Sequence, residues 1–210
     1  MTVERSPSAR KAKRALDRGT AIEQVILDAA VEAMSENGYH GTSVRQIADC
    51  AGMSVANVYH YFPSKHEILF RLMDDNAQHL MNLLEEIVYL SPPHPQERLD
   101  AAVALFVNQH IGRQKLTFVT SSELRALDVG ARAKVVAKRR AIEEIFRRIV
   151  QHGCDTQVFR VSDVRLTTRV ILDMAPSVAV WYRPQGPRSP DEMAQYYVRL
   201  VHRIVGIDEE

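Results

Sequence analysis

The stretch SVRQIADCAGMSVANVYHYF, residues 43–62, decides the fold of the N-terminal part of the chain. Counted from Val44, a small residue, a glycine and an apolar residue stand at the fifth, ninth and fifteenth positions, as Ala48, Gly52 and Val58. At these points two crossing helices need a close contact, a turn that tolerates positive φ, and an anchor in the shared core. The spacing therefore predicts a helix-turn-helix, a DNA-binding arrangement.

The second predicted helix has an outer face suited to bases. On a wheel of about 100° per residue with Val58 pointing inward, Ala56 and His60 lie nearly opposite, and Asn57 and Tyr59 lie at the sides. Asn is the bidentate partner of adenine, and Ala can pack on a thymine methyl. A purely structural pair of core helices is the alternative. The absence of an ordinary solvated Lys–Glu surface argues against it.

Capping patterns predict where several helices begin. A Ser or Thr followed three residues later by Glu or Gln lets the two side chains satisfy free backbone amides at the helix start. The pairs are Thr20/Glu23, Ser43/Gln46, Ser64/Glu67 and Ser189/Glu192, and Ser54 can cap the recognition helix. Lys65 then falls in a first helical turn, where a cation opposes the helix dipole. This position hints at a phosphate partner for Lys65.

Four motifs follow one another in this region. An amphipathic helix ends in NGY and is followed by GTSVRQIA, AGMS and VYHYFPSKHEIL. With these motifs, residues 26–69 resemble the N-terminal domain of TetR/AcrR-type transcriptional regulators. The DNA-contacting positions that the resemblance implies are Thr42, Ser43, Arg45, Ser54, Val55, Ala56, Asn57, Tyr59, His60, Tyr61 and Lys65.

Charge is placed unevenly along the chain. The 210 residues carry a formal net charge of +1, with 46% apolar and 25% charged residues, which is typical of a globular protein. Residues 1–18 hold six basic and two acidic side chains, 6 − 2 = +4. We expect residues 1–19 to form a mobile basic arm that could follow phosphates or enter a minor groove. A solvated leader without function is the alternative.

The rest of the pattern predicts an all-α protein. Helices are expected near 20–37, 43–51, 54–61, 64–90, 95–113, 115–127, 129–152, 162–183 and 190–206. By the resemblance, residues 20–65 form a three-helix DNA-binding domain, and residues 66–210 form a helical ligand-binding and dimerisation domain. The last two helices carry apolar residues on more than one face, so each needs two partners. We therefore expect a homodimer through residues 162–206, which would read a near-palindromic double-stranded operator.

Other classes of protein are disfavoured. Cys50 and Cys154 make no disulfide framework, and eight scattered histidines show no metal-ligand spacing. No nucleophile turn is present, so we expect no catalytic residue, no metal and no cofactor. A helical acyl-processing enzyme is a distant alternative. No signal peptide is recognised, and the apolar run 166–182 is broken by charges and a proline, so we expect a cytoplasmic protein without a membrane span.

The effector is predicted from the middle and the tail of the chain. Aromatic residues among aliphatics suggest an apolar cavity between helices, with Phe106, His110, Phe118, Phe146 and Trp181 as candidate walls. The tail VWYRPQGPRSPDEMA, residues 180–194, resembles the subgroup that controls lipid, fatty-acid or steroid catabolism and responds to acyl-CoA thioesters. An anionic CoA head would need arginines, and the available ones are Arg113, Arg125, Arg169 and Arg183.

The predicted function is therefore a repressor that a small hydrophobic effector, such as an acyl-CoA, releases from DNA. The alternative is a multidrug-responsive efflux repressor, which would place buried carboxylates opposite cationic drugs. Asp173, within an apolar helix, is the one candidate carboxylate for that alternative.

Overall fold

A computed structural model describes the backbone of residues 7–207 and the side chains of residues 19–207. All regular elements in this part of the chain are helices, which confirms the predicted all-α class. The chain divides into two compact units between Leu72 and Met73, inside the helix α4 (Lys65–Leu90). The sequence placed a boundary at the start of this helix, after residue 65. The functional limits 20–65 and 66–210 stay a prediction.

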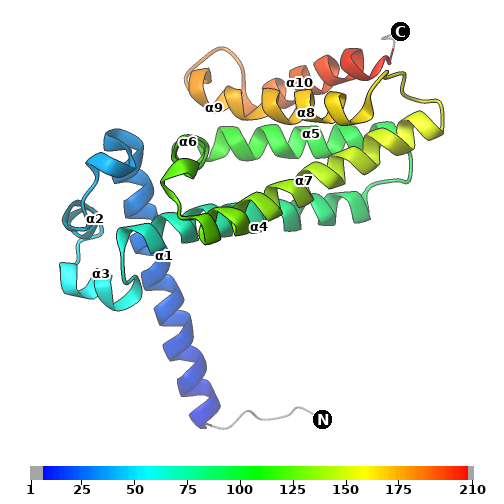
Figure 1. The fold of residues 1–210 in the computed structure, drawn as a ribbon. Coiled ribbons are helices and arrows are strands. Elements are labelled where there is room, and N and C mark those ends of the chain that lie inside the picture. The colour runs from blue at the N-terminus through cyan, green and yellow to red at the C-terminus, as the bar shows by residue number, and fades with distance from the viewer. Residues whose placement is uncertain (1–6, 208–210) are drawn as a thin grey trace. The chain divides into compact units, whose positions relative to one another are not determined.

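The N-terminal unit consists of three helices and the beginning of α4. The three are α1 (Pro7–Gly41), α2 (Val44–Cys50) and α3 (Val55–Tyr61), and α2 packs against both of the others (Figure 1). Its core consists of apolar side chains that are almost completely buried: Ile26, Ala30, Met34, Ile47, Ala48, Val58, Phe62, Ile68 and Leu69.

The start of α1 differs from the expectation. The helix begins at Pro7 rather than near residue 20, so Thr20 is not an N-cap, and most of the expected mobile arm is helical. Residues 9–16 read ARKAKRAL, and Ala, Arg, Lys and Leu are strong helix formers even without an apolar stripe. Residues 1–6 of the expected arm lie outside the described residues. At the other end, Gly38 (φ 69°) interrupts the helix close to the predicted end.

The C-terminal unit is a bundle in which α5 contacts α7 and α10 (Figure 1). After α4, its helices are α5 (Pro95–Gly112), α6 (Gln114–Ser122), the 3₁₀ helix η1 (Glu123–Ala126), α7 (Val129–Asp155), α8 (Val164–Met174), the 3₁₀ helix η2 (Ala175–Ser177), α9 (Val178–Trp181) and α10 (Pro190–Val205). Its core includes Leu99 and Val107 of α5, Phe146 of α7, Ile171 of α8 and Val201 of α10.

The predicted continuous helix 162–183 is wrong, because it breaks into α8, η2 and α9. Pro176 has no amide hydrogen to donate, and its ring conflicts with the carbonyl of Leu172 four residues earlier. The chain therefore changes to a 3₁₀ turn at Ala175. The predicted start of α10 is confirmed: Ser189 and Glu192 form a capping box, and Pro190 occupies the first turn.

The helices α8 and α10 carry two apolar faces, as the sequence predicted. Ile171 and Val201 face the core and are buried. Leu166, Val170 and Tyr196 lie on the other side, with 62%, 46% and 41% of their surface exposed. A single chain therefore leaves an apolar surface on these two helices uncovered.

Candidate DNA-binding surface and effector cavity

The three positions that predicted the helix-turn-helix have the expected geometry. Ala48 and Val58 are completely buried, where α2 and α3 pack. Gly52 lies in the turn between these helices with φ 64°, a conformation that L side chains rarely adopt. The space around its Cα is open, so the backbone angle rather than crowding requires glycine there.

Burial of Val58 turns the opposite side of α3 to the surface. Ala56, Asn57 and His60 are exposed, and Tyr59 has half of its surface exposed. Two further candidates, Val55 and Tyr61, are half-buried. The outer face predicted from the helical wheel is therefore confirmed.

The capping residues hold the starts of both helices. Ser54 Oγ accepts from the Asn57 amide at 3.2 Å and caps α3. At the start of α2, Ser43 Oγ accepts from the Gln46 amide at 3.2 Å, and Gln46 Oε1 accepts from the Ser43 amide at 2.7 Å. Both predicted caps are confirmed. Arg45, in the first turn of α2, is exposed.

Thr42 differs from the other predicted contact residues. Its side chain is 2% exposed, and its hydroxyl lies 2.8 Å from the Gly38 carbonyl oxygen and 3.1 Å from that of Ala33. The hydroxyl thus satisfies backbone acceptors near the end of α1. We assign Thr42 a structural role and remove its side chain from the proposed contact set.

Lys65 also has partners within the protein. Its Nζ donates to the carbonyl oxygens of Tyr39 at 2.7 Å and Thr42 at 2.5 Å. The ammonium lies 4.3 Å from the centroid of the Tyr39 ring, within reach of a cation–π contact. It therefore ties the start of α4 to the acceptors left at the end of α1. A contact between Lys65 and DNA stays a prediction, but its position already has this structural reason.

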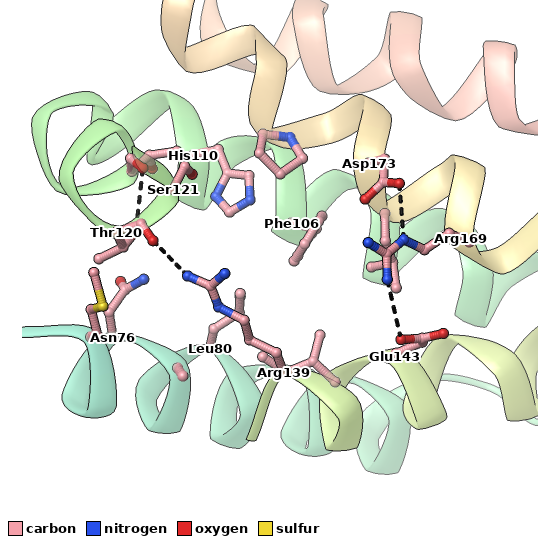
Figure 2. A pocket seen from close by; sticks show the side chains of 16 residues that line it. Asn76, Leu80, Phe106, His110, Thr120, Ser121, Arg139, Glu143, Arg169 and Asp173 are labelled. Atoms are coloured by element: carbon pink, nitrogen blue, oxygen red, sulfur yellow. Dashed lines mark hydrogen bonds and ion pairs between the residues drawn. The ribbon is translucent and has the colours of Figure 1, made fainter. Parts of the chain in front are cut away.

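The C-terminal unit contains a cavity of about 220 Å³. It is lined from α4, α5, α6, α7 and α8 together with η2 (Figure 2). The apolar lining residues are Met73, Ala77, Leu80, Phe106, Ile142, Leu172 and Pro176, and the polar ones are Asn76, His110, Thr117, Thr120, Ser121, Arg139, Glu143, Arg169 and Asp173. The cavity thus combines an apolar body with charged groups of both signs.

Three of the charged side chains that line the cavity pair with one another. Arg169 Nε donates to Asp173 Oδ2 at 2.9 Å, and Arg169 Nη1 lies 3.9 Å from Glu143 Oε2 (Figure 2). Hydrogen bonding to Asp173 raises the pKa of Arg169, with a smaller contribution from Glu143. These side chains are substantially exposed, so they form the solvent-facing part of the lining.

A second polar group lies deeper. His110 is 9% exposed, and its Nε2 is buried without a hydrogen-bond partner among the described residues. Desolvation, with a further contribution from the nearby Arg139, lowers the pKa of His110 from 6.5 to about 4, so the imidazole is neutral at pH 7. Arg139 Nη2 donates to the Thr120 carbonyl oxygen at 2.6 Å, and burial lowers the pKa of Arg139.

The predicted effector residues are only partly brought together. Phe106 and His110 line the cavity with their rings 4.5 Å apart, and Arg169 and Asp173 also line it. The other predicted residues do not line it: Phe146 is buried in the core, Phe118 and Trp181 are about half exposed, and Arg113, Arg125 and Arg183 are exposed. Aromatic content alone could not separate core positions from cavity walls.

Sequence reasoning missed Arg139. It stands in the basic run AKRR, which reads as a solvated surface. Its spacing carried a usable signal, because Val135, Ile142 and Phe146 lie four residues before, three after and seven after it. These three are buried residues of α7, so Arg139 shares their helix face.

Two family descriptions match the chain over both of its parts. "Bacterial regulatory proteins, tetR family" matches residues 26–72, and "Tetracyclin repressor-like, C-terminal domain" matches residues 92–205. The chain belongs to the TetR family. It is therefore a DNA-binding transcriptional regulator and not an enzyme, as the resemblance implied.

Similar TetR-family proteins cover most of the chain. The Fatty acid metabolism regulator protein of Bacillus subtilis is 29% identical over 74% of this chain and 81% of its own length. The HTH-type transcriptional repressor KstR2 of Mycobacterium tuberculosis is 28% identical over 88% of this chain and 92% of its own length. The structure of the TetR-family regulator PfmR from Thermus thermophilus has a TM-score of 0.78 and is 31% identical, covering 85% of this chain and 97% of that one.

Within residues 7–207, no helix is both long and apolar enough to cross a membrane. The run 166–182, which the sequence suggested could not span a bilayer, is divided between α8, η2 and α9.

The contacts of Lys65 predict a stability effect. Lys65→Met keeps the apolar stem but leaves two carbonyl acceptors without their charged donor, which should cost about 1–3 kcal/mol of unfolding free energy. Urea denaturation of the full chain measures this loss. Arg45→Met, an exposed change in the same unit, should stay within about 0.5 kcal/mol of wild type. An unchanged unfolding midpoint for Lys65→Met, together with weakened DNA binding, would instead assign the ammonium to a phosphate.

The burial of His110 predicts an acid-sensitive stability. The unfolded imidazole takes up a proton near pH 6.5, whereas the folded one does so only near pH 4, so folding loses stability as the pH falls through this window. The shift corresponds to about 3 kcal/mol. His110→Phe should remove this part of the pH dependence, measured by urea denaturation between pH 7 and pH 4. His79→Phe, at an exposed histidine of α4, is the control and should keep the wild-type slope.

Proposed function

We propose that this TetR-family regulator is a cytoplasmic repressor that binds a near-palindromic operator as a homodimer and is released by an acyl effector held in the cavity of its C-terminal unit. The main support for this class of effector is the arrangement of charged side chains around that cavity. Its two carboxylates, Glu143 and Asp173, both face Arg169, whereas Arg139 forms no ion pair within the described residues.

The DNA contacts proposed here lie on the exposed side of the helix-turn-helix. Asn57 and His60 offer amide and imidazole groups for base edges, and Ala56 offers a methyl group. The remaining proposed contacts, to phosphates or bases, are made by Ser43, Arg45, Ser54, Val55, Tyr59, Tyr61 and Lys65. Support comes from the burial of Val58, which aims the exposed residues away from the domain core.

The proposed dimer uses the second apolar face of the last helices. Leu166 and Val170 of α8, Tyr196 of α10, and Val180 and Trp181 of α9 expose large apolar side chains. A second copy of the chain would cover this surface, and a two-fold interface would pair it with itself. Two recognition helices related by that symmetry would then read successive major grooves.

The acyl class of effector rests on cavity chemistry and on the relatives. The apolar residues that line the cavity, among them Met73 and Pro176, suit an alkyl chain or a ring system. One relative is named for fatty acid metabolism. The cavity of about 220 Å³ is smaller than most ligand pockets, which occupy about 300–1,000 Å³. We therefore place only the acyl part of a CoA thioester inside, with the CoA part outside.

The efflux-repressor alternative is less well supported. A cationic drug needs a carboxylate that the protein has not already neutralised. Asp173, the candidate for that role, is largely exposed and accepts a hydrogen bond from Arg169. Arg139 would also repel a cation bound in the same cavity.

Single substitutions test the DNA-binding surface. Asn57→Ala and His60→Ala should each weaken operator binding about 5- to 150-fold, because a lost base contact is worth about 1–3 kcal/mol. The measurement is a mobility shift with an operator selected from random duplexes by the wild-type protein. Asp28→Ala, an exposed change on α1 outside the helix-turn-helix, should bind as wild type. Normal binding by both test variants would reject the proposed recognition face.

A ligand screen tests the effector class. We expect acyl-CoAs or free carboxylic acids to raise the melting temperature of the full chain and then to release the selected operator. A tenfold loss of operator affinity requires about 1.4 kcal/mol of coupling between the two sites. Stabilisation by cationic drugs alone, with every thioester and acid inert, would promote the efflux alternative.

A further inference from the structure

We propose that His110 and Arg139 form an oxyanion subsite, and that the effector carries a carboxylate which binds there. This inference rests on the proposed function, because it concerns the same cavity, but it names the group on the ligand and the residues that select it. The carboxylate could be that of a free acid or a second, distal carboxylate on the acyl part of a CoA thioester.

The first observation is the unsatisfied nitrogen of His110. Buried polar atoms almost always have a hydrogen-bond partner, and each exception needs an explanation. His110 Nε2 is buried without a partner among the described residues, in a side chain that lines the cavity and is 9% exposed. A neutral imidazole can present one N–H, so Nε2 is able to donate to a ligand oxygen.

The second observation is the cation beside it. Arg139 rises from α7 toward α6, and its guanidinium lies near His110 and Thr120 (Figure 2). One of its five N–H groups donates to the Thr120 carbonyl oxygen, a neutral acceptor, at 2.6 Å. A partly buried guanidinium without a carboxylate is costly, and the planar fork of its N–H groups matches a carboxylate.

The His110 imidazole and the Arg139 guanidinium can both donate hydrogen bonds to the same anion. Burial, and to a smaller extent the charge of Arg139, lower the pKa of His110, so the imidazole is neutral beside the guanidinium. An incoming carboxylate can accept from Arg139 with one or both oxygens and from Nε2 of His110 with a remaining lone pair. Phe106, whose ring lies against that of His110, and Leu80 then provide apolar surface for the body of the ligand.

Location separates this subsite from the other charges of the cavity. Arg169 is held by Asp173 and Glu143, and all three side chains are substantially exposed. His110, Thr117 and Thr120 are at most 9% exposed, so their side of the cavity is shielded from solvent. An anion bound there is screened less by water and salt than one at Arg169. Selection of a carboxylate therefore falls to Arg139 and His110.

The test compares three probes of one chain length. Octanoate, octanol and octylamine differ in their head groups only, and calorimetric titration of the full chain measures their affinities. We expect octanoate to bind at least tenfold more tightly than octanol, a difference of about 1.4 kcal/mol, and octylamine to bind least. Measurable but equal binding of octanoate and octanol overturns the subsite. If no straight-chain carboxylate from four to twelve carbons binds measurably, a comparison of two thioesters decides the outcome.

Variants then assign the preference to the two side chains. Arg139→Gln should reduce the ratio of the octanoate affinity to the octanol affinity to near one. His110→Phe should reduce this affinity ratio severalfold while keeping a ring against Phe106. Arg140→Gln, the exposed neighbour on α7, should keep the wild-type ratio. Circular dichroism and the melting temperature check that each variant is folded. If Arg139→Gln does not fold, Arg139→Met takes its place. A preference for octanoate that survives the loss of Arg139 overturns the proposal.

Two thioesters distinguish the sources of the carboxylate. If the effector is a free acid, Arg139→Gln weakens the binding of octanoate, and neither thioester binds to the wild type more tightly than octanoate does. If it is a distal carboxylate, octanedioyl-CoA binds more tightly than octanoyl-CoA, and Arg139→Gln removes that difference. Equal binding of both thioesters by wild type and Arg139→Gln, with octanoate inert, would overturn the subsite and leave the acyl-CoA function standing.

Discussion

The burial of Val58 against α2 is the constraint on which the DNA-binding unit depends. A helix of seven residues has little stability of its own, so α3 is held by packing rather than by propensity. Val58 supplies that packing, and Ala48 leaves room for the crossing. Every exposed position of α3 is set by this one anchor, because a helix rotates as a rigid body. Gly52 makes the arrangement possible by turning the chain with positive φ.

Polar contacts fix the surroundings of that anchor. Thr42 and Lys65 both bind backbone carbonyls around the end of α1, one through a hydroxyl and the other through an ammonium. Their residue types could serve DNA equally well. The family resemblance implied a DNA contact for both, and the position of Lys65 in a first helical turn pointed to a phosphate. The structure shows that the acceptors nearest to them belong to the protein. The two side chains therefore stabilise the end of α1, and Lys65 also joins it to the start of α4.

In the C-terminal unit, the arrangement of charge matters more than its amount. The cavity is lined by two arginines and two carboxylates, so its formal charge is zero with His110 neutral. Both carboxylates face Arg169, which leaves Arg139 as a cation held by a carbonyl. A cavity of zero net charge can therefore still select an anion, because the two arginines have different partners.

The sequence by itself determined the elements and their local chemistry. The helix-turn-helix spacing, the caps at Ser43, Ser54 and Ser189, and the two apolar faces of the last helices all follow from short-range patterns, since a cap or a helical face depends on residues at most a few turns apart. Local reasoning failed at the start of α1, where helix propensity prevailed without an apolar stripe, and at Pro176, where a missing amide hydrogen broke an otherwise apolar helix. Only the tertiary structure decided which aromatic residues face a cavity, that the guanidinium of Arg139 lies near His110, and that Arg169 pairs with both carboxylates. These choices depend on how α4 to α8 pack around a common space, and side chains from helices far apart in the sequence meet there only after the chain has folded.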